Sequence, residues 1–112
     1  MNANDQLKEF TGTGNYYRHA LDMLFTDGVK ELCDRFECWW LLWVVISYQP
    51  NMKQHEFQVW KLMVNEDESA VIKCADGNGN LLVKQEISFT DFKAKRATIW
   101  IEGNIILLPS EH

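Results

Sequence analysis

The chain has 112 residues and a mass of 13.1 kDa, which is the size of one domain, so we expect a single domain over residues 1–112. Apolar residues make up 46% of the chain and charged residues 24%, a balance that excludes wholesale disorder. The net charge of −5 argues against electrostatic binding to nucleic acid or to an anionic membrane, because both carry negative charge.

The first residues and the longest apolar run bear on where the protein is found. Residues 1–9 are polar and lack the apolar stretch of a signal peptide. The apolar run over residues 38–46 is too short for a membrane-spanning helix, which needs about 20 residues. The cysteines show no CxxC spacing and are Cys33, Cys38 and Cys74. We therefore expect a soluble, cytoplasmic protein with reduced thiols.

The first half of the chain begins with turn-forming residues and then predicts a helix. Residues 1–15 are a turn-rich lead-in, and residues 16–25 fit either a short strand or an irregular helix. A helix is predicted over residues 27–36, because Thr26 and Asp27 can accept hydrogen bonds from its first amides. Its apolar face is formed at helical spacing by Val29, Leu32, Cys33 and Phe36.

A second helix is predicted over residues 38–49, ending before Pro50 and separated from the first by a kink near Glu37. The β-branched residues 44–46 keep a strand open as the alternative. If the segment is a helix, three tryptophans share an arc of about 100° on it. They are Trp39, Trp40 and Trp43. The opposite side is also apolar, so something must cover both faces of this helix.

The second half of the chain predicts strands joined by tight turns. The predicted strands are residues 57–64, 70–75, 81–88, 98–102 and 105–108. Asn and Gly, which tolerate positive φ, mark hairpin turns at residues 76–80 and 103–104. Helices followed by a run of strands predict an α+β fold, in which two helices pack on a four- to five-stranded antiparallel sheet in two layers.

Short segments along nearly the whole chain carry a resemblance to a known family. They are residues 10–13, 17–19, 26–30, 41–42, 56–60, 76–80, 89–92 and 107–111. In these segments the chain resembles a family of small bacterial proteins that is known only as a domain of unknown function. Its members occur in bacterial genomes, including plasmid and phage-related regions. The resemblance implies no activity. The chain departs from the family pattern at Gly14, where that pattern is acidic, and at Trp43, where it is acidic or polar.

The most polar cluster in the sequence is Tyr17-Arg18-His19, with Asp27 close behind it. As a ligand or anion site, Arg18 would form paired hydrogen bonds to a carboxylate or a phosphate. As a purely structural cluster, Arg18 would pair with Asp22 or Asp27 and Tyr17 would pack against the core. The structural interpretation is the one we favour, because the resemblance supplies no chemistry for this cluster.

Two loops have partial motifs for ligands. Residues 76–80 have the opening spacing of a calcium loop, but Leu81 and Ile87 stand where that loop requires Gly and Glu. Residues 11–15 are rich in Gly, but no Gly-Lys-Ser/Thr follows them to cradle a phosphate. The sequence therefore predicts a hairpin turn and a surface loop at these places.

Nothing in the sequence indicates a metal, a cofactor or a catalytic group. A zinc site would lack a fourth ligand, since its candidates are Cys33, Cys38 and His19. Cys33 lies on an apolar helix face, where we expect it to be buried and inert. The basic residues at 93–96 and the acidic run at 66–68 are too small for a nucleic-acid surface or its mimic.

Three hypotheses on function follow. The first is a non-enzymatic protein-interaction module that binds itself, as a homodimer, or another protein through Trp39, Trp40 and Trp43. The second is a small-ligand or anion binder, or an enzyme, with a site at Tyr17, Arg18, His19 and Asp27. The third is an inhibitor of a host or defence enzyme, which rests on small size and on the mobile-element association of the relatives alone. We favour the first.

Overall fold

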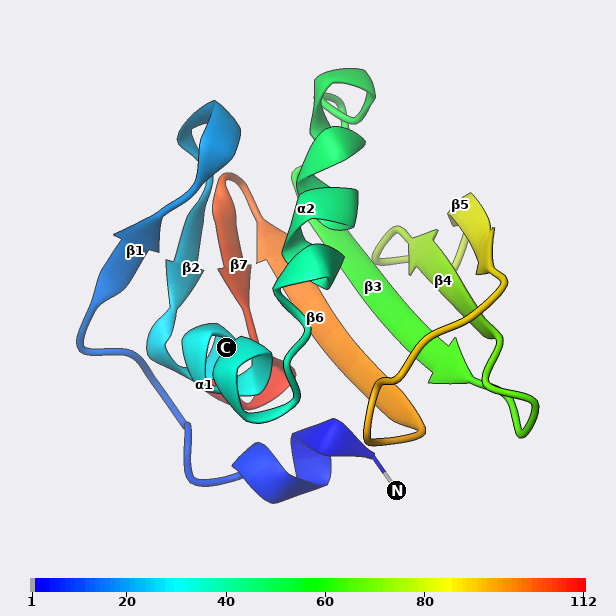
Figure 1. Cartoon of the computed structure of the whole chain (residues 1–112). Coiled ribbons are helices and arrows are strands. Elements are labelled where there is room, and N and C mark those ends of the chain that lie inside the picture. Colours follow the sequence, from blue (N-terminus) through cyan, green and yellow to red (C-terminus); the bar gives the residue numbers. More distant parts are fainter. Residues whose placement is uncertain (1) are drawn as a thin grey trace.

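A computed structural model of the chain describes residues 2–112 and has an α+β fold, in which one mixed sheet of seven strands has both α-helices on the same face (Figure 1). The helices are α1 (Asp27–Arg35) and α2 (Trp39–Ser47). The strands are β1 (Tyr16–Arg18), β2 (Leu24–Thr26), β3 (Phe57–Val64), β4 (Ala70–Ala75), β5 (Leu81–Ile87), β6 (Arg96–Glu102) and β7 (Ile105–Leu107). Short 3₁₀ helices lie at Ala3–Leu7, Ala20–Asp22, Gln49–Asn51 and Pro109–Glu111.

The strand order is β1-β2-β7-β6-β3-β4-β5, and all neighbours are antiparallel except β2 and β7. The prediction of four to five antiparallel strands was therefore wrong in number and in the direction of one pair. The additional strands are β1 and β2, which form from the segment that fitted a strand or an irregular helix. Each has three residues, too few to show alternation, and β2 runs parallel to a strand some 80 residues later, with Leu24 opposite Ile105.

The predicted kink near Glu37 is a complete break between α1 and α2. Glu37 has φ +52°, outside the helical region, and the amide of Cys38 donates to the carbonyl of Cys33. α1 begins as predicted, because the hydroxyl of Thr26 accepts a hydrogen bond from the amide of Val29 at 3.3 Å. The break lets α2 turn away from α1 and run along the sheet (Figure 1).

The core lies between the helices and the sheet. The sheet contributes buried residues at alternate positions, namely Trp60, Leu62, Ile72, Cys74, Ile99 and Ile101. The helices cover them with Val29, Leu32, Leu41, Leu42, Val45 and Ile46. After β5 the chain crosses back toward β6 on the same side, and Phe92 packs against Phe36 with ring centroids 5.6 Å apart.

The other face of the sheet, called the open face below, is covered by neither α-helix (Figure 1). Its half-buried residues include Phe57, Val59 and Trp100. Lys61, Lys73 and Lys84 lie directly opposite one another across β3, β4 and β5. We call these three residues the lysine row.

The last residues close one end of α1. The carboxylate of Glu111 accepts hydrogen bonds from the hydroxyl of Thr26 at 2.6 Å, the amide of Gly28 at 3.0 Å and the amide of Leu108 at 2.9 Å. A negative charge at the start of a helix is also favoured by the helix dipole. A side chain at position 28 would collide with this carboxylate, because a Cβ there would lie 2.6 Å from Glu111 Oε1.

Candidate functional site

Aromatic rings fill the contact between the β1–β2 hairpin and α2. The ring of Tyr17 stacks on Phe25 at 5.3 Å, and Phe25 meets Trp39 edge-on at 5.4 Å. His19 meets Trp43 edge-on at 4.6 Å and lies 6.0 Å from Phe25. We call these five residues the aromatic seam. It joins two clusters that the sequence presented as separate candidates.

Strand and helix periodicity explain how these side chains meet. Successive side chains of a strand point to opposite faces, so Tyr17 and His19 point to the helix side and Arg18 does not. Trp39 and Trp43 are four residues apart and therefore share one face of α2. The indole of Trp39 is further fixed by a hydrogen bond that it donates to Asp34 at 3.1 Å.

Two large apolar side chains remain in water, one in the seam and one in the turn that follows His19. Trp43 is 60% exposed and Leu21 is 62% exposed, whereas Trp39 and Trp40 are half-buried. Leu21 and Asp22 both have φ +59°, in the left-handed region that residues other than Gly rarely adopt. The backbone there is strained, and the strained turn carries Leu21 at its tip.

Hydrogen bonds around the turn hold it in this conformation. The amide of His19 donates to the carbonyl of Met23 at 2.7 Å, and the amide of Ala20 donates to Nδ1 of His19, also at 2.7 Å. The side-chain amide of Asn104 donates to the carbonyl of Asp22 at 3.1 Å. His19 therefore serves both the turn and the seam.

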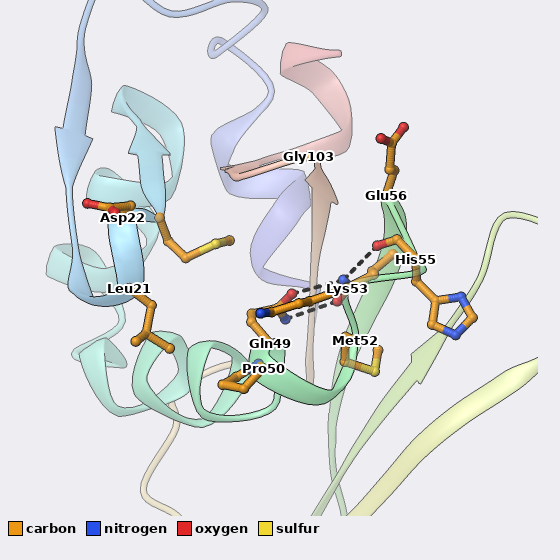
Figure 2. Close-up of a pocket in the computed structure, with 11 residues that line it drawn as sticks. Leu21, Asp22, Gln49, Pro50, Met52, Lys53, His55, Glu56 and Gly103 are labelled. Carbon is orange, nitrogen blue, oxygen red and sulfur yellow. Dashed lines mark hydrogen bonds between the residues drawn. The ribbon is translucent and has the colours of Figure 1, made fainter.

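A pocket of about 560 Å³ lies between this turn and the segment that follows α2. Figure 2 shows Leu21 and Asp22 on one side of it and Gln49 and Pro50 across from them. The ring of His55 points away from the pocket in the same view. The volume lies in the range of small-ligand sites and exceeds that of a single large side chain.

Gln58 is a buried polar residue of the pocket lining, with only 1% of its surface exposed. Its amide donates to Gln49 Oε1 at 2.9 Å and to the carbonyl of His55 at 3.0 Å (Figure 2). Its oxygen accepts from Gln49 Nε2 at 3.0 Å and from Trp60 Nε1 at 2.8 Å. Both donors and both lone pairs are thus satisfied within the protein, so this amide supports the pocket and has no capacity left to bind a ligand.

Tyr17 and Asp27 do meet, as part of the predicted ligand cluster. The hydroxyl of Tyr17 donates to Asp27 Oδ1 at 2.8 Å, and the amides of Gly14 and Asn15 donate to Oδ2. The bond from Tyr17 is the first cause that holds the pKa of Asp27 below its usual value, and it also raises the pKa of Tyr17. These bonds fold residues 11–15 onto the start of α1.

The cavity beside this pair, about 640 Å³, carries mostly negative charge. Glu9, Asp27 and Glu31 line it, and its one lysine, Lys30, is already bonded to Asp34 at 2.8 Å. Arg18 is exposed, lies on the other side of β1 and forms no ion pair with Asp22 or Asp27 within residues 2–112. Like charges repel, so this cavity disfavours an anion.

The three cysteine thiols lie in the interior of the protein. Cys33, Cys38 and Cys74 are buried, as predicted for Cys33. A hydrogen bond with Cys38 and burial raise the pKa of Cys33, and burial raises that of Cys74 to about 12, so neither is a thiolate at neutral pH. Within residues 2–112 no three His, Cys, Asp or Glu side chains are grouped to hold a metal ion.

The turns with partial ligand motifs have structural roles. The carboxylate of Asp76 accepts hydrogen bonds from the amides of Asn78 and Asn80 at 2.8 and 2.9 Å, and Gly79 has φ +85°. This is a hairpin turn, as predicted.

None of the helices in the described part of the chain is long and apolar enough to cross a membrane.

Comparison with known proteins identifies the family of the chain. The sequence matches a family of unknown function, DUF6876, over residues 1–112. The chain belongs to this family. No curated protein and no solved structure matches it. The predicted resemblance to a family without assigned activity is thereby confirmed, and membership in DUF6876 supplies no chemistry of its own.

Sequence reasoning missed three parts of the site in this DUF6876 protein. Leu21 was interpreted as one of the inward-pointing residues of segment 16–25, which was wrong, because nothing in its residue type indicates the left-handed turn that exposes it. Gln49 and Gln58 were not singled out as candidates. Phe25 was taken only as the end of an ambiguous segment, although its ring joins Tyr17 to Trp39. A signal was available for Gln58, which lies two residues before Trp60 and therefore on the same face of the strand predicted over residues 57–64.

Proposed function

We propose that this protein is a non-enzymatic interaction module that binds a protein partner through the aromatic seam, with Trp43 and Leu21 as its anchors. The observation that carries the proposal is the exposure of Trp43 by 60% while its ring is held in place by His19. A large aromatic ring that is rigid before binding loses little conformational entropy on binding, which is why tryptophan dominates many interfaces.

The position of Leu21 supports the same surface. A leucine in the left-handed region costs on the order of 1–3 kcal/mol, and here it leaves the side chain in water. Such strain at the tip of a turn is typical of sites that contact a ligand or a partner. Leu21 lies two residues after His19 in the chain, and Trp43 packs against the ring of His19, so we take these two exposed side chains as the apolar anchors.

The pocket next to Leu21 gives the surface a concave part. Met23, Pro50 and Met52 contribute apolar lining, and Lys53 and Glu56 contribute charges. Interfaces commonly combine exposed aromatic anchors with such a pocket, into which the partner inserts a side chain. The satisfied amides of Gln49 and Gln58 keep the pocket open without offering catalytic groups.

The cavity beside Tyr17 and Asp27 is lined mostly by negative charges. This makes the hypothesis of a ligand binder or enzyme at these residues the weaker alternative. The carboxylates of this cavity disfavour an anion at Tyr17 and Asp27, and Arg18 lies on the other side of the strand. An inhibitor of a host or defence enzyme would use the proposed surface, with that enzyme as the partner. The same experiment therefore addresses the first and third hypotheses.

Photo-cross-linking from a single position tests the proposal. A benzoyl-phenylalanine in place of Trp43 is compared with one in place of Tyr16, which is an aromatic residue of similar exposure, at 56%, outside the seam. In cells that naturally contain the protein, we expect discrete protein adducts from position 43 and not from position 16. A second copy of the chain, another protein or an enzyme is then identified by mass spectrometry.

Two results would contradict the proposal. One is that the probe at position 43 gives no protein adduct, or gives only the adducts that the probe at position 16 also gives. The other is a Leu21→Ser variant that remains folded by circular dichroism and cross-links from position 43 as strongly as the unchanged chain does. Leu21→Ser is suited to this control because the side chain is outside the core.

A further inference from the structure

We propose that two copies of this chain pair through β5, antiparallel and around a twofold axis at Gln85, so that their sheets join into one. This contact is separate from the aromatic seam and goes beyond the proposed partner surface. It rests on three observations: β5 is a free edge of the sheet, its charged residues Lys84 and Glu86 lie on either side of Gln85, and Lys84 ends the lysine row.

β5 is a free edge of the sheet. It has seven residues, and within residues 2–112 it pairs only with β4 and no segment lies beyond it (Figure 1). Its outer N–H and C=O groups are a template for another strand, and proteins usually protect such an edge. The opposite edge, β1, has only three residues. The long edge is therefore the one suited to pairing.

The sequence of β5 complements itself when it is turned around Gln85. An antiparallel pair centred on this residue places Lys84 opposite Glu86 of the second copy, and Glu86 opposite its Lys84. Val83 comes opposite Ile87 of the second copy on the helix side. Opposite charges and β-branched residues are favourable cross-strand neighbours. If the charges of β5 served to keep other strands away, like charges would lie opposite each other in this register and would repel the second copy.

The lysine row gives this pairing an electrostatic reason. Lys84 lies directly opposite Lys73, which in turn lies opposite Lys61, and like charges in these positions repel. Within residues 2–112 none of these three lysines forms an ion pair. Glu86 of the second copy would place a negative charge on the free side of Lys84, at the end of the row.

Exposed apolar residues lie near both ends of β5. Leu81 is 58% exposed at its start, and Phe89 is 63% exposed just after its end. In the register centred on Gln85, the start of one β5 lies beside the end of the other. Each end of the pairing therefore brings a Leu81 and a Phe89 of different copies into one region, where both lose contact with water.

Charge reversal tests the register, with sedimentation equilibrium of the full chain at low ionic strength as the measurement. We expect the unchanged chain to sediment at twice 13.1 kDa. Lys84→Glu places two glutamates opposite each other, and Glu86→Lys places two lysines opposite each other, so each variant should sediment as a monomer. A 1:1 mixture of the two should form a dimer again, because every opposed pair is then complementary. The double variant should also form a dimer.

The controls reverse exposed charges away from β5. Lys95→Glu and Glu66→Lys should leave the dimer intact, and circular dichroism should show all variants folded. A monomeric unchanged chain at millimolar concentration would overturn the proposal. So would a dimer that survives both single reversals, or a mixture that stays monomeric. Trp43→Ala should leave the mass unchanged, which separates a failure here from a failure of the proposed partner surface.

Discussion

The imidazole of His19 lies edge-on against the exposed indole of Trp43, with their ring centroids 4.6 Å apart. Burial lowers the pKa of His19 from its usual 6.5. Because Nδ1 accepts the amide proton of Ala20, the neutral ring carries its proton on Nε2. The histidine is therefore neutral at pH 7 and joins the strained turn to the tryptophan.

Removal of the indole should change the titration of this histidine. We expect Trp43→Ala to raise the pKa of His19 toward 6.5, because the imidazole regains contact with water. Titration of the imidazole signals by NMR measures the shift, and Phe89→Ala serves as the control, since it removes an exposed ring elsewhere. An unchanged or lower pKa would show that Trp43 does not desolvate His19.

The lowered pKa of His19 also determines whether the stability of the fold rises or falls with pH. The folded-state pKa lies below the unfolded-state value, so the unfolded chain takes up the proton first as the pH falls. The free energy of unfolding should therefore decrease from about pH 6.5 downward, through the folded-state pKa of His19. His19→Gln should remove this part of the pH dependence in denaturant titrations.

Loss of the Gln58 amide should destabilise the fold. Gln58→Leu leaves the indole N–H of Trp60 and the amide of Gln49 without this partner, and each unsatisfied buried group costs about 1–3 kcal/mol. Urea denaturation measures the change. Gln54→Leu, at an exposed position, is the matched control and should change the free energy of unfolding little. Equal effects of the two substitutions would contradict the role of the amide network.

Asp27 should contribute stability at neutral pH that is lost in acid. The bond from Tyr17, followed by those from Gly14 and Asn15, holds its folded-state pKa below 3.8. The contribution is complete above about pH 3.8 and disappears as the pH falls through the folded-state pKa. Asp27→Asn should flatten the acid limb of stability against pH, whereas Asp91→Asn, an exposed control, should leave it unchanged. Identical acid limbs in all three proteins would contradict this assignment.

A double-mutant cycle should couple Gly28 to Glu111. Glu111→Ala removes the acceptor of three hydrogen bonds and should cost about 1–3 kcal/mol. Gly28→Ala should also destabilise, because the new Cβ would displace that carboxylate. In the Glu111→Ala background the cost of Gly28→Ala should fall, since the nearest atoms are gone. Additive effects, measured by thermal denaturation, would show that the two residues do not interact.

Local patterns in the sequence predicted most of the sheet and both helices. Thr26 and the apolar spacing after it were enough for α1, and alternation was enough for β3, because these signals lie within a few residues of chain. The segment of β1 and β2 was left open between a short strand and an irregular helix, since strands of three residues carry no periodicity. The direction of β2 depends on Ile105, far along the chain, and no local pattern reports such a partner.

The parts of the site were visible in the sequence, but their arrangement was not. Tyr17 and His19 stood out for their polarity and Trp39 and Trp43 for their helical spacing. Their contact depends on the β1–β2 hairpin lying beside α2, which is a tertiary relationship. The strained turn at Leu21 was also beyond prediction, because tertiary hydrogen bonds, including one from Asn104, stabilise it.

The parallel pairing of β2 with β7 has a consequence for the order in which the protein is made. Within residues 2–112, the β1–β2 hairpin pairs with the rest of the sheet through Leu24–Ile105 and Phe25–Ile106 of β2 and β7. A ribosome delivers β1, β2 and α2 well before it delivers β7, at about 5–20 residues per second. A nascent chain that ends before β7 therefore lacks the strand with which β2 pairs, and only the aromatic contacts with α2 are available to hold the hairpin. The sheet partner that holds this hairpin beside α2 is thus made only when β7 is translated.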